Sequence, residues 1–159
     1  MAEPNTQANF VDLGLPGMLP VLNEECLDLA IKASLGLGGR ILPLIKFDRK
    51  HYCYSDLPQS YQITQKHNPI MKDGRLFFFD YRDQESHILI DRIQMEQDTA
   101  KSIYRGNKVL IDYNRAGMPL LEIVTQAQNT HPEDAKIIVR EMQELLQQLE
   151  ISDALIEAG

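Results

Sequence analysis

The chain has 159 residues, which is enough for one domain with a hydrophobic core and too few for two. Its 43% apolar and 25% charged residues are typical of a globular protein, and no apolar run approaches the length of a membrane span. The net charge of −7 argues against a domain that grips a nucleic-acid backbone by itself. The clustered cations suit a small anionic group in a pocket better, and they are Lys46, Arg49, Lys50, Lys101, Arg105 and Lys108.

The two cysteines, Cys26 and Cys53, are too few to form a zinc site by themselves. Cys26 falls on the apolar face of a predicted helix, where a small buried thiol is expected. Unpaired thiols fit a reducing, intracellular compartment. The first ten residues, MAEPNTQANF, have neither the basic nor the apolar region of a secretory signal, so no signal is predicted there.

The first elements expected along the chain are a loop and a helix. Residues 1–22 place prolines and glycines around apolar anchors and predict an extended segment. Asn23 is a favourable N-cap, and apolar residues recur after it at helical spacing until Gly38 and Gly39. A helix is therefore expected between Asn23 and this glycine pair.

Short β-rich runs follow from Ile41 to about Val124, separated by Gly, Pro, Asp and Asn. Residues 76–82 and 86–95 are predicted to be the two arms of a hairpin. A last helix is expected from Pro132, which suits the first helical position and precedes two acidic residues. Its apolar series is Ala135, Ile138, Val139, Met142, Leu145, Leu146 and Leu149. This order predicts an α+β fold, with a mostly antiparallel sheet and flanking helices.

One candidate for chemistry is the basic, tyrosine-rich stretch KFDRKHYCYSDLPQSYQITQ, residues 46–65. Here Asp48, Arg49 and Lys50 adjoin several tyrosines. A solvated strand end followed by a turn explains the same residues without any chemistry.

A second candidate is the acidic stretch RIQMEQDTAK, residues 92–101. Glu96 and Asp98 lie two residues apart, which places them on one face of a strand. Two such carboxylates suit an Mg²⁺ ion that also holds ATP phosphates. An ordinary polar strand end is the alternative.

Long composite motifs run through practically the whole chain and resemble one family, the GatB family of aspartyl/glutamyl-tRNA amidotransferase subunits. FDRK.Y.Y.DLP..YQI.Q and DYNRAG.PL.EIV are the most specific of these motifs. The stretches that carry the resemblance, in chain order, are AEPNTQANFVDLGLPGMLPVLNEE, KFDRKHYCYSDLPQSYQITQ, RIQMEQDTAK, VLIDYNRAGMPLLEIVTQ and HPEDAKIIVREMQELLQQLEISD.

The resemblance implies a heterotrimer, in which this protein works with an amidase-type subunit and a small third subunit on misacylated Glu-tRNA(Gln) or Asp-tRNA(Asn). ATP and Mg²⁺ serve to phosphorylate the side-chain carboxylate, and ammonia released from glutamine in the amidase-type subunit then displaces the phosphate. The resemblance also implies a catalytic domain similar in fold to the glutamine synthetase and guanido kinase group. A bacterial cytoplasm or an organellar matrix is the implied location, without a membrane.

The resemblance further implies roles for individual residues. Lys50 matches a lysine of the active site and the ammonia channel, with Arg49 and Tyr54 as further catalytic candidates. Asp48 and Lys101 are expected to bind the ATP cofactor. The implied Mg²⁺ ligands are Glu96, Gln97, Asp98 and Glu157. No zinc is expected, because the cysteine cluster that some members carry before LGLPG is missing here.

Departures from the family pattern bear on activity. Gln94 replaces a histidine, and Gln97 replaces a glutamate that resembles an Mg²⁺ ligand, so weaker Mg²⁺ binding is expected. Residues 1–159 lack the family's first strand and its helical and tail domains, and so look like an incomplete catalytic domain. We expect this polypeptide not to transamidate alone. The alternative function is that of a non-catalytic remnant that only binds partner subunits.

Overall fold

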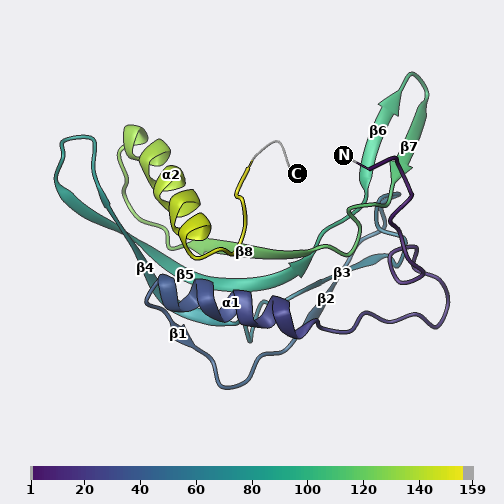
Figure 1. The fold of residues 1–159 in the computed structure, drawn as a ribbon, viewed down its shortest axis with the longest axis horizontal. Coiled ribbons are helices and arrows are strands. Elements are labelled where there is room, and N and C mark those ends of the chain that lie inside the picture. Colours follow the sequence, from purple (N-terminus) through teal and green to yellow (C-terminus); the bar gives the residue numbers. More distant parts are fainter. Residues whose placement is uncertain (1, 156–159) are drawn as a thin grey trace.

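The computed structural model describes residues 2–155, which form two helices and eight strands (Figure 1). In chain order the elements are α1 (Glu24–Gly36), β1 (Arg40–Ile41), β2 (Asp48–His51), β3 (Tyr61–Thr64), β4 (Met71–Phe79), β5 (Glu85–Gln97), β6 (Lys101–Arg105), β7 (Lys108–Asp112), β8 (Pro119–Thr125) and α2 (Pro132–Gln148). The predicted α+β class is confirmed, since the strand pairs formed by these residues are antiparallel. Neither helix within residues 2–155 is long and apolar enough to cross a membrane.

Both predicted helix starts are confirmed, because a side chain caps each of them. The Asn23 side chain accepts a hydrogen bond from the backbone N–H of Glu25 at 2.9 Å. His131 Nδ1 accepts one from the backbone N–H of Glu133 at 3.3 Å, and Pro132 lies in the first turn. These bonds satisfy N–H groups that have no partner inside the helix.

The main sheet has four strands in the order β1-β4-β5-β8. β4 and β5 form the predicted hairpin, in which Phe79 pairs with Glu85 near the tip and Met71 pairs with Ile93 at the far end. β5 pairs with β8 along its other edge, so it is a central strand of the sheet. Figure 1 shows these strands as a long, curved surface.

A β-bulge in β5 decides which of its side chains face the core. Its register with β8 shifts just after Ile90. Before the shift the even-numbered Ile90 is buried in the core, and after it the odd-numbered Ile93 and Met95 are buried there. Because strand side chains alternate, Gln94 and Glu96 turn to the opposite face of the sheet.

One hydrophobic core joins the sheet to both helices. Its fully buried members include Ala30, Ala33, Met71, Ile90 and Ile93. α2 packs against it through partly buried side chains, namely Ile137, Ile138, Met142, Leu145 and Leu146. Cys26, expected to be buried, is partly buried against this core. Val139, expected in the apolar series of α2, is 56% exposed.

Two small hairpins, β2–β3 and β6–β7, lie at the end of the sheet away from the β4–β5 tip (Figure 1). The β2–β3 hairpin is attached to β5 through the buried Gln65 side chain, whose Oε1 accepts the Met95 backbone N–H at 3.0 Å. The β6–β7 hairpin projects from the sheet, and the N-terminal segment is bonded to its base. There the Asp112 carboxylate accepts the Asn5 backbone N–H at 3.1 Å.

Candidate functional site

The two polar stretches singled out in the sequence lie against each other in the structure. The basic stretch forms β2 and β3, and β3 packs beside the acidic end of β5. Gln62 Nε2 donates a hydrogen bond to the Gln97 carbonyl oxygen at 2.7 Å. The Thr64 hydroxyl donates one to the Glu96 carboxylate. This junction is the candidate functional site.

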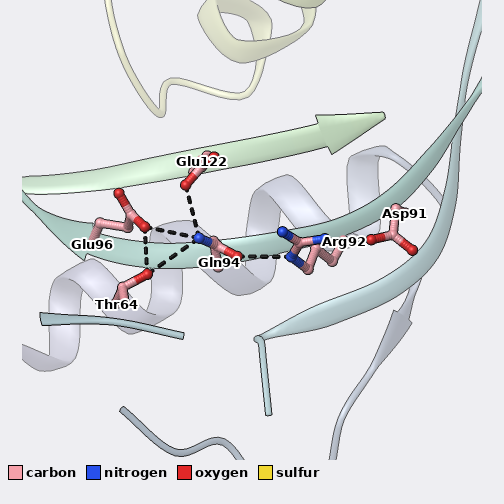
Figure 2. A network of polar contacts seen from close by, with 6 residues as sticks. All are labelled: Thr64, Asp91, Arg92, Gln94, Glu96 and Glu122. Atoms are coloured by element: carbon pink, nitrogen blue, oxygen red, sulfur yellow. Dashed lines mark hydrogen bonds and ion pairs between the residues drawn. The ribbon is translucent and has the colours of Figure 1, made fainter. Parts of the chain in front are cut away.

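A buried amide joins two carboxylates at this junction (Figure 2). Gln94 is 6% exposed and donates from Nε2 to Glu96 Oε1 and to Glu122 Oε2, both at 2.8 Å. Its Oε1 accepts from Arg92 Nε at 2.8 Å. Gln94 and Glu122 are directly opposite each other on β5 and β8, which explains why their side chains meet. We call Thr64, Gln94, Glu96 and Glu122 the acidic network.

Glu122 is the member of the acidic network that sequence reasoning missed. Burial raises the pKa of Glu122, and the neighbouring Glu96 carboxylate raises it further because two like charges repel. The Gln94 amide and the Arg92 charge act against this rise. A signal was present in the sequence, since Glu122 is the one charged residue in the otherwise apolar strand Pro119–Thr125.

Lys50 and Arg49 occupy opposite faces of the β2–β3 hairpin. Directly opposite strand residues share a face, and Lys50 is opposite Gln62, whose Nε2 lies 3.4 Å from a Glu96 carboxylate oxygen. Arg49 lies over the Tyr61 ring, with its guanidinium carbon 4.8 Å from the ring centre. Of these two catalytic candidates, Lys50 therefore has the strand position on the side of the acidic network.

The two tyrosines beyond Lys50 have different surroundings. Tyr54, a catalytic candidate, is 70% exposed, and its ring meets that of Tyr52 edge-on with centres 5.5 Å apart. Lys50 Nζ is 5.7 Å from the centre of the Tyr52 ring. Burial raises the pKa of Tyr52, and three nearby carboxylates raise it further, those of Asp56, Glu96 and Asp98. Tyr52 thus keeps its hydroxyl proton and is available as a hydrogen-bond donor beside the acidic network.

The two residues expected to bind ATP have different neighbours. The Asp48 carboxylate accepts the backbone N–H of Lys66 at 3.0 Å, and this bond lowers the pKa of Asp48. Asp48 thereby ties the start of β2 to the chain just after β3. Lys101 begins β6 and lies opposite Asp112 at the base of the projecting hairpin. Nucleotide binding by either residue stays a prediction.

The other expected metal ligands do not all join the acidic network. β5 ends at Gln97, so Asp98 lies beyond the strand alternation that predicted a face shared with Glu96. Asp98 Oδ2 instead forms an ion pair with Arg115 Nε at 2.8 Å. Gln97 Oε1 is buried and has no hydrogen-bond partner among the described residues. Glu157 lies outside the described part of the chain.

The acidic network offers the donor chemistry of a magnesium site with few protein ligands. Residues 2–155 contain no group of three or more His, Cys, Asp and Glu side chains placed to hold a metal. Mg²⁺ commonly takes one or two carboxylates and completes its coordination with water and phosphate oxygens. Glu96 and Glu122 supply two carboxylates, and the unpartnered Gln97 oxygen is a neutral acceptor next to Glu96 on the same strand. These residues fit Mg²⁺.

A cavity of about 370 Å³ lies where the start of α1 approaches the end of β5. Most of its lining is apolar, including Val21, Leu22, Phe47, Ile63 and Met95. Glu96 and Gln97 are its polar members on β5. An apolar wall with a few polar groups is typical of a small-molecule site, and Glu96 connects this cavity to the acidic network.

The class of protein follows from these features. The chain is an α+β domain whose antiparallel sheet carries paired carboxylates beside a basic hairpin, and it is built to bind an anionic ligand through a cation. The sequence model described as the GatB/GatE catalytic domain matches residues 1–159. The chain therefore belongs to this family, as its motifs indicated.

Three relatives illustrate the match. The mitochondrial glutamyl-tRNA(Gln) amidotransferase of Komagataella phaffii has a GatB subunit that is 42% identical over 164 residues, which cover 99% of this chain and 33% of that protein. The corresponding subunit of the aspartyl/glutamyl-tRNA(Asn/Gln) amidotransferase of Mycoplasma mobile is 44% identical over 157 residues, with the same coverage. That of the mitochondrial glutamyl-tRNA(Gln) amidotransferase of Dictyostelium discoideum is 45% identical, over 98% of this chain and 29% of that protein. The chain thus spans about a third of the length of these relatives.

Proposed function

We propose that this chain is the carboxylate-activating domain of a tRNA-dependent amidotransferase. The complete reaction converts Glu-tRNA(Gln) or Asp-tRNA(Asn) to Gln-tRNA(Gln) or Asn-tRNA(Asn), with ATP, Mg²⁺ and ammonia from glutamine. The observation that carries the proposal is the meeting of the acidic network with the Lys50 face of the β2–β3 hairpin. The names of the relatives support the same reaction.

The chemistry requires a carboxylate to become a better acyl donor, because a free carboxylate has no leaving group. Phosphorylation supplies one, and an Mg²⁺ ion, when bound, would neutralise the charge on the phosphoryl group. Glu96 and Glu122 would hold that ion. Lys50 adds a positive charge on the same side, and the protonated Tyr52 hydroxyl is a donor for an oxygen of the anionic substrate.

The proposal extends to assembly and setting. An amidase-type subunit would supply the ammonia and a small third subunit would complete the heterotrimer. The negative net charge of this chain supports tRNA binding largely by other parts of the complex. The antiparallel sheet supports a fold like that of glutamine synthetase and the guanido kinases. Relatives from mitochondria and from Mycoplasma mobile support an organellar matrix or a bacterial cytoplasm.

A second candidate function is that of a non-catalytic binding module, and two neutral side chains favour it. Gln94 lies between the two carboxylates of the acidic network. Gln97 presents an amide oxygen, where a carboxylate would attract a cation more strongly. Such a module would bind the partner subunits without supporting amidation.

A chimaeric protein distinguishes these two functions. Residues 1–159 replace the matching part of the Dictyostelium discoideum relative, which keeps its own flanking sequence and partner subunits. We expect ATP-dependent conversion of Glu-tRNA(Gln) to Gln-tRNA(Gln), which is lost in E96Q and in E122Q. The exposed Phe79 provides a control, F79A, that should keep the activity. A chimaera that assembles fully but converts no tRNA would favour the binding module.

A further inference from the structure

The Gln94 side chain lies between two carboxylates that come from neighbouring strands (Figure 2). Its Nε2 carries two hydrogens, and the two shortest contacts, both 2.8 Å, are to Glu96 Oε1 and Glu122 Oε2. Each carboxylate therefore receives one N–H. The third neighbour of Nε2 is Thr64 Oγ1 at 3.2 Å, and this hydroxyl gives its own proton to Glu96.

The orientation of this amide is determined by its surroundings. Arg92 Nε carries a hydrogen and lies 2.8 Å from Gln94 Oε1, so the other end of the amide is left for the carboxylates. In the reversed orientation a donor would face Arg92, and the carbonyl oxygen would face two negatively charged groups. The side chain is also almost completely buried, which limits its movement. The nitrogen therefore points at the carboxylates.

A bridging cation and this amide exclude each other. An Mg²⁺ ion bound to both Glu96 Oε1 and Glu122 Oε2 would lie about 2.1 Å from each oxygen. The Gln94 nitrogen is 2.8 Å from the same two oxygens, so it already fills the space between them. A cation must break two charge-assisted hydrogen bonds to bridge the pair.

We propose that Gln94 is a positioning residue that holds Glu96 and Glu122 together in the metal-free protein and competes with a divalent cation for this pair. The inference rests on the proposed function only for the choice of Mg²⁺ as the natural cation. Its physical content is general, because the neutral amide gives each carboxylate a hydrogen bond and so offsets their mutual repulsion. The cation affinity of the site is then set by how easily Gln94 is displaced.

Mn²⁺ binding to the 159-residue chain, followed by the EPR signal of free Mn²⁺, tests this competition. Q94L keeps a similar side-chain volume and removes both donors. We expect Q94L to bind Mn²⁺ roughly tenfold more tightly, because two hydrogen bonds to charged groups no longer compete. Unchanged or weaker binding by Q94L overturns the proposal, and so does an absence of binding in both proteins.

Q62L is the matched control for this experiment. Gln62 also donates to Glu96, at 3.4 Å, and its main partner is the Gln97 carbonyl oxygen rather than Glu122. We expect Q62L to leave Mn²⁺ affinity unchanged or to lower it, since a bridging cation need not displace Gln62. An increase equal to that of Q94L would show that any lost donor has this effect, which overturns the role assigned to Gln94.

A second measurement needs no substitution in the protein that is titrated. The side-chain NH₂ resonances of Gln94, assigned by their loss in Q94L, should shift during a titration with Mg²⁺ as the amide leaves the carboxylates. Those of Gln128, which donates to the Leu89 carbonyl oxygen, serve as the reference. Unchanged Gln94 resonances up to high Mg²⁺ overturn the proposal. Both measurements are independent of tRNA amidation, so their failure leaves the proposed function to be judged by the chimaera.

Discussion

The Glu96 carboxylate receives hydrogen bonds from three side chains, and two of these belong to another hairpin. Thr64 and Gln62 reach it from β3, and Gln94 reaches it from its own strand. A partly buried carboxylate needs such donors, because removing the charge from water is otherwise costly. The network that places Glu96 thus also attaches β3 to β5.

Substituting Thr64 tests how much this attachment contributes to stability. Thr64 is 7% exposed, and T64V keeps its shape while removing the hydroxyl that donates to Glu96. We expect the free energy of unfolding to fall by about 1–2 kcal/mol, because a buried carboxylate loses a donor. Urea denaturation measures the change. T125V, at the exposed end of β8, is the control and should change stability by less than about 0.5 kcal/mol. Equal losses in the two variants would contradict this role for Thr64.

Residue-scale prediction succeeded for Glu96 as an acidic member of the site and missed Glu122. Glu96 lies in a stretch with several polar side chains, so its position attracts notice in the sequence. Glu122 meets it only because β8 pairs with β5 in a register that places Glu122 opposite Gln94. That register follows the bulge after Ile90, and no local pattern in either strand reveals it.

At the scale of elements, three consecutive phenylalanines in β4 show what strand pairing adds to the sequence. A run of identical apolar residues contains no alternation, so the sequence cannot say which of them faces the core. In the structure Phe78 is 7% exposed, whereas Phe77 and Phe79 are 69% and 55% exposed. The difference arises because Phe78 shares its face with Leu76, which belongs to the core under the helices.

Alanine substitutions at adjacent positions test this assignment. We expect F78A to lower the free energy of unfolding by about 3–5 kcal/mol, because it leaves a cavity in the core. F77A removes an exposed ring, whose centre lies 5.9 Å from that of His87, and should cost no more than about 0.5 kcal/mol. Chemical denaturation of both variants under one set of conditions gives the comparison. Similar losses would mean that the hairpin register differs from the one described.

The strands themselves were predictable to different degrees. The β4–β5 hairpin and both helix starts follow from turn residues, apolar content and capping residues, and these predictions are confirmed. β3 did not stand out, because its buried side chains are the polar Gln62 and Thr64. Their burial makes sense only beside Glu96, which is a contact between distant parts of the chain. Hydrophobic patterning therefore cannot find a strand whose buried face is polar.

At the scale of the whole molecule, hydrogen bonds between side chains and backbone connect parts that share little apolar surface. Gln65 bonds the β2–β3 hairpin to β5 through the Met95 N–H. The N-terminal segment is held at the base of the β6–β7 hairpin, where the Asn5 side chain donates to the Ile111 carbonyl oxygen and accepts the Tyr113 N–H. Neither connection could be predicted from the sequence, because each joins residues at least thirty positions apart.

The attachment of the N-terminal segment should depend on pH through Asp112. The backbone N–H groups of Asn114 and Asn5 each lie 3.1 Å from Asp112 Oδ1, and these bonds lower the pKa of Asp112. A lowered pKa means that the folded state favours the ionised carboxylate. The resulting stabilisation is complete above the usual aspartate pKa of about 3.9 and is lost as the pH falls through the lower, folded-state value.

Amide hydrogen exchange at Asn5 measures this attachment. We expect the protection of the Asn5 N–H to decrease as the pH falls below the usual aspartate range, whereas the N–H of Ile70, bonded to the Ile93 carbonyl oxygen in the core, stays protected and shows that the sheet remains folded. D112A should lack the Asn5 protection at every pH. D112N should keep part of it without pH dependence, because its amide oxygen still accepts the bond but does not titrate. Protection of Asn5 that is independent of pH and survives in D112A would mean that the bonds of the Asn5 side chain hold this segment without help from the carboxylate.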